Sequence, residues 1–317
     1  MAMNLPGLGP EIDERGAAST AAEELTERRR GKRLSRRRLY VRRFFRNTGA
    51  VIGLAIFVLL ALLGLFGRFL THWDYQAVDF TALSVKPGTG GHIFGTNGSG
   101  NDTYAQLVHG LGRSMIIAIS VSVLTTVFAA LFGAAAAFFG GRVEKTMLGV
   151  IHFLLILPSF LVIALVGTHY SGRWQVLIVV FTIFGWMLTA RVIWSLSTSL
   201  REREYVLAAR FMGVSSMRTI VRHLVPNIGS LLIVTFTLGV AATVQSETAL
   251  SFIGFGVKPP DVSLGSMLAD GQGTLSTAPW LFYLPAALVV LLTVSMALIG
   301  DGLRDALDPN SQSGGRA

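Results

Sequence analysis

The amino-acid sequence predicts an all-α polytopic membrane protein with six transmembrane helices. Of the 317 residues, 51% are hydrophobic and only 14% are charged, whereas about 25% charged residues is usual in soluble proteins. The apolar residues gather into runs long enough to cross the roughly 30 Å hydrocarbon core of a bilayer. The 35 glycines fit the same class, because glycine is more frequent in membrane helices than in soluble ones.

The first predicted helix covers 47–70, and at 1.5 Å per residue it extends for about 36 Å, enough to cross with some tilt. The segment before it, 1–46, is polar and basic, and we expect most of it to be disordered. A cleavable signal peptide is not predicted, because the charged stretch and the apolar run are both too long. The further predicted spans are 113–140, 146–168, 174–197, 228–256 and 280–300.

Basic residues divide unevenly between the two sides of these spans. With the N-terminus in the cytoplasm, the inner segments hold 22 of the 27 Lys and Arg residues and the outer segments hold five. Cytoplasmic loops of membrane proteins carry such an excess, and six spans return the chain to its starting side. We therefore expect both termini in the cytoplasm. The basic block before the first span is a topology signal beside lipid headgroups, which argues against nucleic acid as a partner.

Several kinds of chemistry are excluded. Cys is absent, and the six histidines are never closer than 17 residues apart. Disulfides, thiol catalysis and Cys-ligated zinc are therefore excluded, and the His spacing lacks the close pairs of helical metal sites. The Gly-rich segment 88–100 lacks the Gly-Lys-Ser/Thr ending of a P-loop. We predict no catalytic residue, no metal site and no cofactor bound by this chain.

Three connections are too long for simple turns: the external segments 71–112 and 257–279 and the cytoplasmic segment 198–227. In the first, Asn101 or Asp102 caps a predicted short helix that runs to about Gly110. Its apolar stripe predicts a helix lying in the outer membrane interface. The stripe comprises Tyr104, Leu107, Val108 and Leu111.

The cytoplasmic connection predicts two short helices. Glu204 suits the first turn of the first one, Gly213 its C-terminal stop, and Pro226 the first turn of the fifth span. An apolar face at helical spacing includes two adjacent alanines, which would let a partner surface lie close to the backbone. A helix resting on lipid is the alternative. The face comprises Tyr205, Ala208, Ala209 and Met212.

Glu247 is the only carboxylate well inside a predicted span. Intramembrane acids are functional candidates by default, but with Gln245 and Ser246 beside it a hydrogen-bonded structural role is equally open. In the next external connection, Pro259 and Pro260 stiffen the chain. They either present this loop to a binding protein or form a rigid turn.

Four stretches resemble motifs of ABC-importer permeases. The cytoplasmic loop is similar to their Glu-Ala-Ala, three residues, Gly, nine residues, Ile-x-Leu-Pro pattern, with Leu207 at the glutamate position. Residues 94–102 (FGTNGSGND), 247–260 (ETALSFIGFGVKPP) and 299–309 (IGDGLRDALDP) resemble the signatures GTDxxGRD, ExxLSFLGLGVxPP and LLGDGLRDALDP. Together they resemble the second, C-type permease of the dipeptide/oligopeptide/nickel importer family. The loop positions that match are Ala208, Ala209, Gly213 and Pro226.

The resemblance covers about 40–309 and implies a type I ABC-importer permease fold over 113–304, followed by a cytoplasmic tail, 305–317. It implies a multi-pass protein of a bacterial inner (plasma) membrane. The implied partners are a second homologous permease, two ATP-binding subunits (or one with two ATPase domains) and an extracytoplasmic substrate-binding protein. ATP and Mg would be used by those partners. The residues expected to couple to the ATPases are Glu204, Tyr205, Ala208, Ala209, Met212, Gly213 and Pro226.

Within this family the substrate stays open between di- or oligopeptides, nickel and another small solute. An ion-coupled secondary carrier is the rival from another class. It would need intramembrane ionisable residues, of which Glu247 is the only candidate, and we see none of the internal repeats common in such carriers. A structural membrane subunit without transport activity is the third alternative.

Overall fold

The computed structural model describes residues 36–170 and 172–308. The chain separates into two units, Met1–Arg43 and Phe44–Ala317. The described part of the first unit belongs to helix α2 (Arg36–Arg46), so the end of the predicted disordered tail is helical. The rest of that prediction, and residues 309–317 of the predicted C-terminal tail, lie outside the described residues.

The second unit is built from helices. Among the described residues, β-structure is limited to isolated bridges in the 71–102 connection. In the part of the chain that the structure describes, four helices are long and apolar enough to cross a membrane by themselves. They are α3 (Thr48–Phe66) with its 3₁₀ extension η1 (Gly67–Leu70), α4 (Thr103–Phe139), α12 (Gly229–Phe252) and α14 (Trp280–Leu307).

Two bent helix pairs are further candidate spans. Helices α5 (Gly141–Ile156) and α6 (Ser159–His169) meet at 68°, and α7 (Trp174–Gly185) and α8 (Met187–Arg201) meet at 40°. Counting each pair as one span gives the six that the sequence predicts. The sharper bend has a local cause, because Pro158 disfavours helical backbone at the residue before it, and Leu157 is extended there (φ −68°, ψ 130°).

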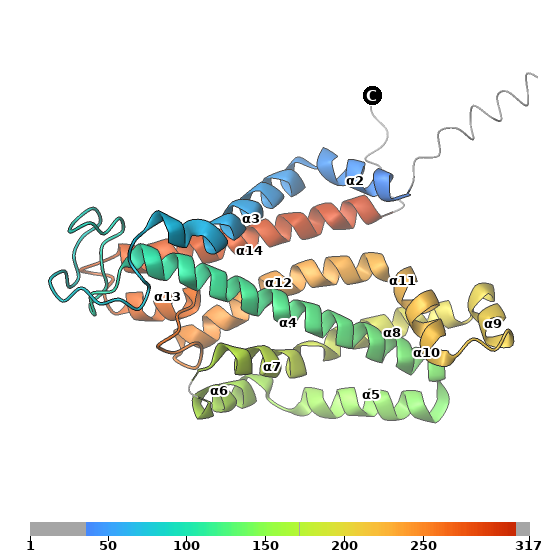
Figure 1. The fold of residues 1–317 in the computed structure, drawn as a ribbon. Helices are drawn as coiled ribbons and strands as arrows, with labels where there is room; N and C mark the ends of the chain where they lie inside the picture. The colour runs from blue at the N-terminus through green and yellow to red at the C-terminus, as the bar shows by residue number, and fades with distance from the viewer. Residues whose placement is uncertain (1–35, 171, 309–317) are drawn as a thin grey trace, which may run out of the picture. The chain divides into compact units, whose positions relative to one another are not determined.

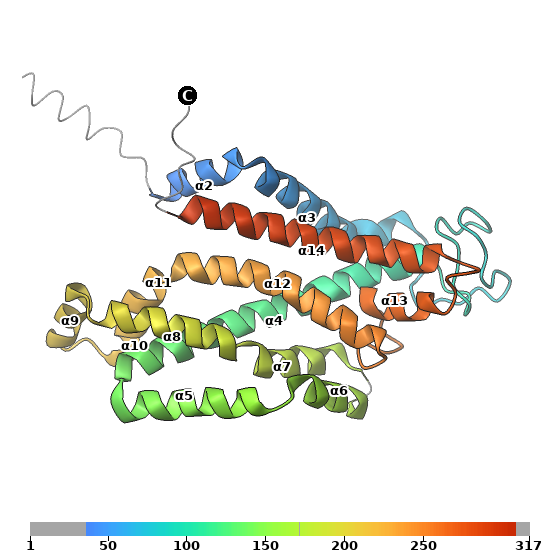
Figure 2. The ribbon, with the colours of Figure 1, turned by 180° about the vertical axis from the view of Figure 1, so that it is seen from behind.

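Helix α4 lies at the centre of the unit, where α3, α7, α8 and α12 all contact it (Figures 1 and 2). Small residues make this packing close. A Cβ atom on Gly133 would stand 2.5 Å from the Ala190 carbonyl oxygen of α8, so only glycine fits there. Buried alanines follow on both sides of Gly133, from Ala129 to Ala137. Such small residues allow membrane helices to approach each other.

The two ends of the bundle differ. One end, here called the outer end after the sequence prediction, gathers the 71–102 connection and the short helix α13 (Leu264–Gln272) (Figure 1). The opposite, inner end carries the connection between α8 and α12. It comprises α9 (Glu204–Phe211), α10 (Ser216–Thr219), the π-helix η2 (Ile220–Leu224) and α11 (Val225–Asn227).

The prediction of a separate interfacial helix before span two is wrong. Asp102 does cap a helix, since its side chain accepts a 2.7 Å hydrogen bond from the Ala105 amide, but that helix is α4 itself, unbroken to Phe139. The predicted stripe faces protein rather than lipid, with Leu107 and Leu111 both buried. This stripe is buried because the first turns of α4 pack closely against the start of α13. A Cβ atom on Gly110 would stand only 3.2 Å from the Ser263 carbonyl carbon.

Candidate functional site

The inner connection is a folded unit with a defined stop. Gly213 adopts φ +75°, a left-handed conformation that glycine adopts at little cost. Its amide donates to the Arg210 carbonyl, and the Val214 amide donates to the Ala209 carbonyl, which is the Schellman pattern of a helix C-terminus. The predicted stop at Gly213 is confirmed, and Glu204 lies in the first turn of α9 as predicted.

One side of this connection packs onto the inner end of α4. Val206 and Ala209 of α9 are buried, and Ala209 is only 2% exposed. Val206 joins Ile220 and Leu224 in a cluster with Ala134 and Phe138 of α4. The expectation that Ala209 shares an exposed face with Ala208 is therefore wrong. The reason is helix rotation, since Val206 and Ala209 are three residues apart and turn inward together.

The other side exposes large apolar side chains, which we call the inner apolar patch. Phe211 is 89% exposed and Met212 is 76% exposed, immediately before the turn at Gly213. The prediction included Met212 but missed Phe211, although a large apolar residue beside a C-terminal glycine is a readable signal. Pro226 is exposed in α11, between the patch and α12. The patch comprises Tyr205, Leu207, Ala208, Phe211, Met212 and Met217.

Arg201 fastens the same connection to α4. Its Nη1 donates a 2.8 Å hydrogen bond to the Ala137 carbonyl in the last turn of α4, where carbonyls lack helical partners and a positive charge is favourable. Glu144 of α5 lies 3.9 Å from the same nitrogen and accepts a 2.9 Å hydrogen bond from the Trp194 indole. Helices α4, α5 and α8 are thus joined at the point where the inner connection begins.

At the outer end, Glu247 is 1% exposed and joins three helices. Its Oε1 accepts 2.7 Å hydrogen bonds from the hydroxyls of Ser251, on the same helix, and Ser263, the N-cap of α13. Its Oε2 accepts a longer bond, 3.4 Å, from Ser114 of α4. This geometry supports the structural interpretation of Glu247. The neighbouring Gln245 and Ser246 are exposed on the other face of α12.

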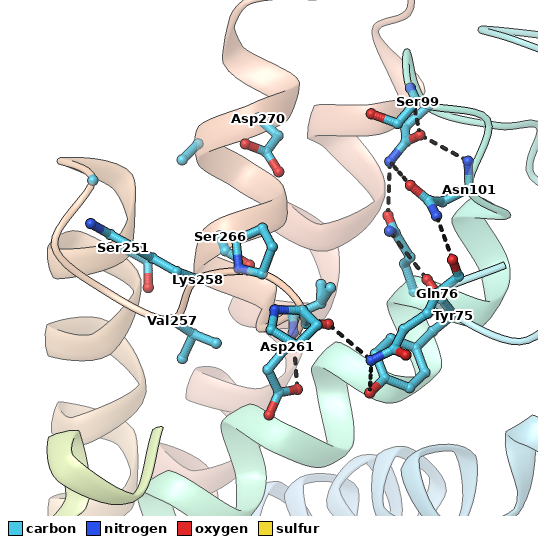
Figure 3. Close-up of a pocket in the computed structure, with 17 residues that line it drawn as sticks. Tyr75, Gln76, Ser99, Asn101, Ser251, Val257, Lys258, Asp261, Ser266 and Asp270 are labelled. Atoms are coloured by element: carbon cyan, nitrogen blue, oxygen red, sulfur yellow. Dashed lines mark hydrogen bonds between the residues drawn. The ribbon is translucent and has the colours of Figure 1, made fainter. Parts of the chain in front are cut away.

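A polar cavity of about 450 Å³ opens at the outer end, between the 71–102 connection and the α12–α13 segment (Figure 3). Tyr75, Gln76 and Asn101 form one wall, and Lys258 and Asp270 belong to the other. The surrounding walls desolvate the Asp270 carboxyl, which raises its pKa. Lys258 and Asp270 thus place a basic and an acidic side chain at this cavity.

The loop with the two prolines is fixed rather than free. The Gln76 amide donates to the Pro260 carbonyl across the cavity (3.3 Å), and the Pro259–Pro260 peptide is cis. Asp261 makes a 2.9 Å ion pair with Arg113 and a 2.7 Å contact with His109, both on α4. A rigid turn is what this geometry supports, with both prolines exposed at the surface.

The 71–102 connection has its own polar core, which the sequence did not predict. His92 is fully buried, stacks on Trp73 and contacts the Asp102 carboxylate through Nδ1 at 2.8 Å. Asp79 lies 3.6 Å from the other ring nitrogen. Hydrogen bonds from Thr81, with a further contribution from His92, lower the pKa of the Asp79 carboxyl. Within the described ranges, no group of three or more His, Asp or Glu side chains is arranged to hold a metal ion.

Comparisons with known proteins agree with this architecture. Residues 127–312 match the family of the binding-protein-dependent transport system inner membrane component, and residues 35–87 match the N-terminal transmembrane domain of oligopeptide transport permease C. The oligopeptide transport system permease protein OppC of Mycobacterium tuberculosis is 47% identical over 281 residues, which cover 88% of this chain and 96% of that protein.

More distant relatives carry the same name. The OppC proteins of Bacillus subtilis and Escherichia coli are 33% and 32% identical, over 84% and 86% of this chain and 87% and 90% of their own lengths. Together with the apolar helices, these matches identify a multi-pass protein of the bacterial inner membrane. The chain belongs to the family of binding-protein-dependent transport inner membrane components, in the oligopeptide permease C group.

Proposed function

We propose that this chain is one of two homologous permease subunits of an ATP-driven importer for di- and oligopeptides. Two ATP-binding subunits, or one with two ATPase domains, bind at the inner end and use ATP and Mg. An extracytoplasmic binding protein delivers the peptide to the outer end. Both chain termini lie in the cytoplasm. This chain itself binds no cofactor and performs no covalent chemistry. The relatives' names support peptides over nickel.

The observation that carries this proposal is the inner apolar patch on its rigid base. Phe211 and Met212 are exposed beyond the bundle, whereas Val206 and Ile220 beneath them are buried against α4. Exposed large apolar side chains on an ordered support are typical of a protein-docking surface. A surface of this kind on the cytoplasmic side fits a groove on an ATPase subunit.

Helix α4 supplies the mechanical link. Its 37 residues extend for about 55 Å, from the Asp102 cap at the outer end to the Arg201 contact at the inner end. Near its outer end, Ser114 contacts both Glu247 and the Leu264 amide at the start of α13. Movement of the docked α9 would therefore move α4 as a rigid body and displace the outer end of the bundle. Rigid-body movement of this kind is a known form of conformational switching.

The test is uptake in proteoliposomes that contain this chain, the second permease, the ATPase subunits and the binding protein. We expect a labelled tripeptide to accumulate when ATP is supplied on the ATPase side, with a protonophore present. Accumulation that needs an ion gradient and ignores ATP would favour the ion-coupled carrier. Wild-type proteoliposomes without peptide uptake under either condition would contradict the proposed substrate.

Two variants examine the coupling. Ala208→Trp fills the exposed patch, and Gly213→Val places a side chain at φ +75°, which costs about 1–2 kcal/mol per residue and reshapes the turn beside Met212. Both should lose ATP-driven uptake while the chain still inserts into the membrane. Val143→Trp, at an exposed position near the start of α5, is the control and should transport normally. Normal uptake in both patch variants would contradict docking through α9.

A further inference from the structure

A second cavity lies among the membrane-spanning helices. It has a volume of about 390 Å³ and is lined by α4, α7, α8 and α12. None of its lining residues is charged. Hydroxyl groups supply its polarity, and Gly185, Gly239 and Ala242 contribute only small side chains. The hydroxyl residues are Thr125, Thr126, Thr189, Thr235, Thr243 and Ser246.

Most of these hydroxyls have no hydrogen-bond partner among the described residues. Serine and threonine in a helix commonly donate to the carbonyl four residues earlier, as Thr125 and Thr243 do here at 2.8 Å. The other four cavity hydroxyls make no hydrogen bond with any residue in 36–170 or 172–308. They are those of Thr126, Thr189, Thr235 and Ser246.

Hydrocarbon cannot supply the missing partners, and an unsatisfied polar group there is costly. The cavity residues of α12 lie opposite the buried face of that helix. Thr235, Ala242 and Ser246 lie on one face and span about 16 Å at mid-helix. The buried face of the same helix, with Val240, Val244 and Glu247, packs into the protein. The hydroxyls on the cavity face gain hydrogen-bond partners only if this face meets water or a polar ligand.

We propose that this hydroxyl-lined cavity is this chain's share of the translocation pathway and that it binds the main-chain amide groups of the passing peptide. Hydroxyls both donate and accept hydrogen bonds, which matches the N–H and C=O groups that every peptide carries. The small residues leave room for a side chain of any size. With no charge in the lining, acidic and basic peptides are treated alike. This inference rests on the proposed function.

The first test uses the absence of cysteine from the chain. Ala242→Cys and Ser246→Cys are introduced separately into the complete importer, which is treated with a water-soluble maleimide. Modification is read as a mass shift of this chain. Because the thiolate is the reacting species, a thiol must be hydrated to react. Leu161→Cys, on the exposed apolar surface of α6, is the control.

We expect both cavity thiols to react several times faster than the control, and an excess of unlabelled tripeptide to slow them. Reaction no faster than at Leu161→Cys would overturn the inference. Uptake by the unmodified importer separates the two claims. ATP-driven peptide uptake with unreactive cavity thiols would refute the cavity assignment alone. Absence of peptide uptake by the wild type would refute the proposed function.

The second test asks whether the cavity sets charge tolerance. Ala242→Glu places a carboxylate in the lining, and Ala242→Gln adds a side chain of similar size without charge. We expect the Glu variant to import an acidic tripeptide about tenfold less well than a basic one, a factor that corresponds to 1.4 kcal/mol. The Gln variant and the wild type should import both about equally. Equal uptake of both peptides by the Glu variant would place this face outside the pathway.

Discussion

Replacement of Glu247 separates a structural role from a direct role in transport. In the native chain its carboxylate accepts hydrogen bonds from Ser251, Ser263 and Ser114, and so it connects α12 to α13 and α4. Glu247→Ala removes the acceptor for all three hydroxyls. Glu247→Gln keeps the shape and one acceptor oxygen, and its new amide can donate to the Ser114 hydroxyl.

The magnitude follows from the bonds that are lost. The two 2.7 Å bonds leave buried hydroxyls unsatisfied in the Ala variant, at about 1–3 kcal/mol each. The 3.4 Å bond from Ser114 contributes least, because hydrogen bonds weaken with distance. With the space left by the truncated side chain, the free energy of unfolding should fall by roughly 3–6 kcal/mol for Ala and by about 1–2 kcal/mol for Gln.

The assay is the inactivation half-life of the purified importer in detergent at raised temperature, followed by peptide uptake after reconstitution. A half-life is the appropriate quantity, since large membrane complexes unfold irreversibly. We expect the half-lives to fall in the order wild type, Gln, Ala, and the Gln variant to keep most of its uptake. A Gln variant that is as stable as the wild type but inactive would refute the structural role and make Glu247 part of the transport step.

Three further outcomes follow from the contacts of α4. Gly133→Val should push α8 away at Ala190 and cost about 1–3 kcal/mol, seen as a lower yield of monodisperse complex; a wild-type yield would contradict the packing. Asp102→Ala should cost about 1–2 kcal/mol and speed hydrogen exchange in the first turn of α4, whereas Asp102→Asn should retain the cap and native exchange. Arg201→Met should reduce uptake more than ATP hydrolysis, since it frees the inner connection from α4; equal loss of both would argue against a coupling role.

Features that depend on local chemistry were predictable from the sequence. Apolar runs gave the spans, and capping residues gave helix ends, as at Asp102 and Gly213. The start of α3 has the same kind of cap, because the Asn47 side chain accepts from the Ala50 amide. These signals lie within a few residues of the feature that they specify, so one sequence is enough to read them.

Features that depend on helix rotation were not predictable. Periodicity placed Ala209 beside Ala208 on one apolar face, but α9 packs onto α4 through Val206 and Phe138, and Ala209 turns inward with Val206. The same limit left Glu247 open between two roles, because its partners Ser114 and Ser263 are distant in sequence. The continuity of α4 was missed because its first turns pack against α13, a contact that no local pattern encodes.

The central claim is that ATPase subunits drive this permease through the inner apolar patch, and site-specific cross-linking tests it most directly. Met212→Cys provides a single thiol in a chain without cysteine, and it carries a short photoactivated cross-linker in the assembled importer. Val150→Cys, exposed in the middle of α5, is the matched control. We expect Met212→Cys to cross-link to an ATPase subunit and Val150→Cys not to do so. Cross-links from Met212→Cys to lipid alone would contradict the claim.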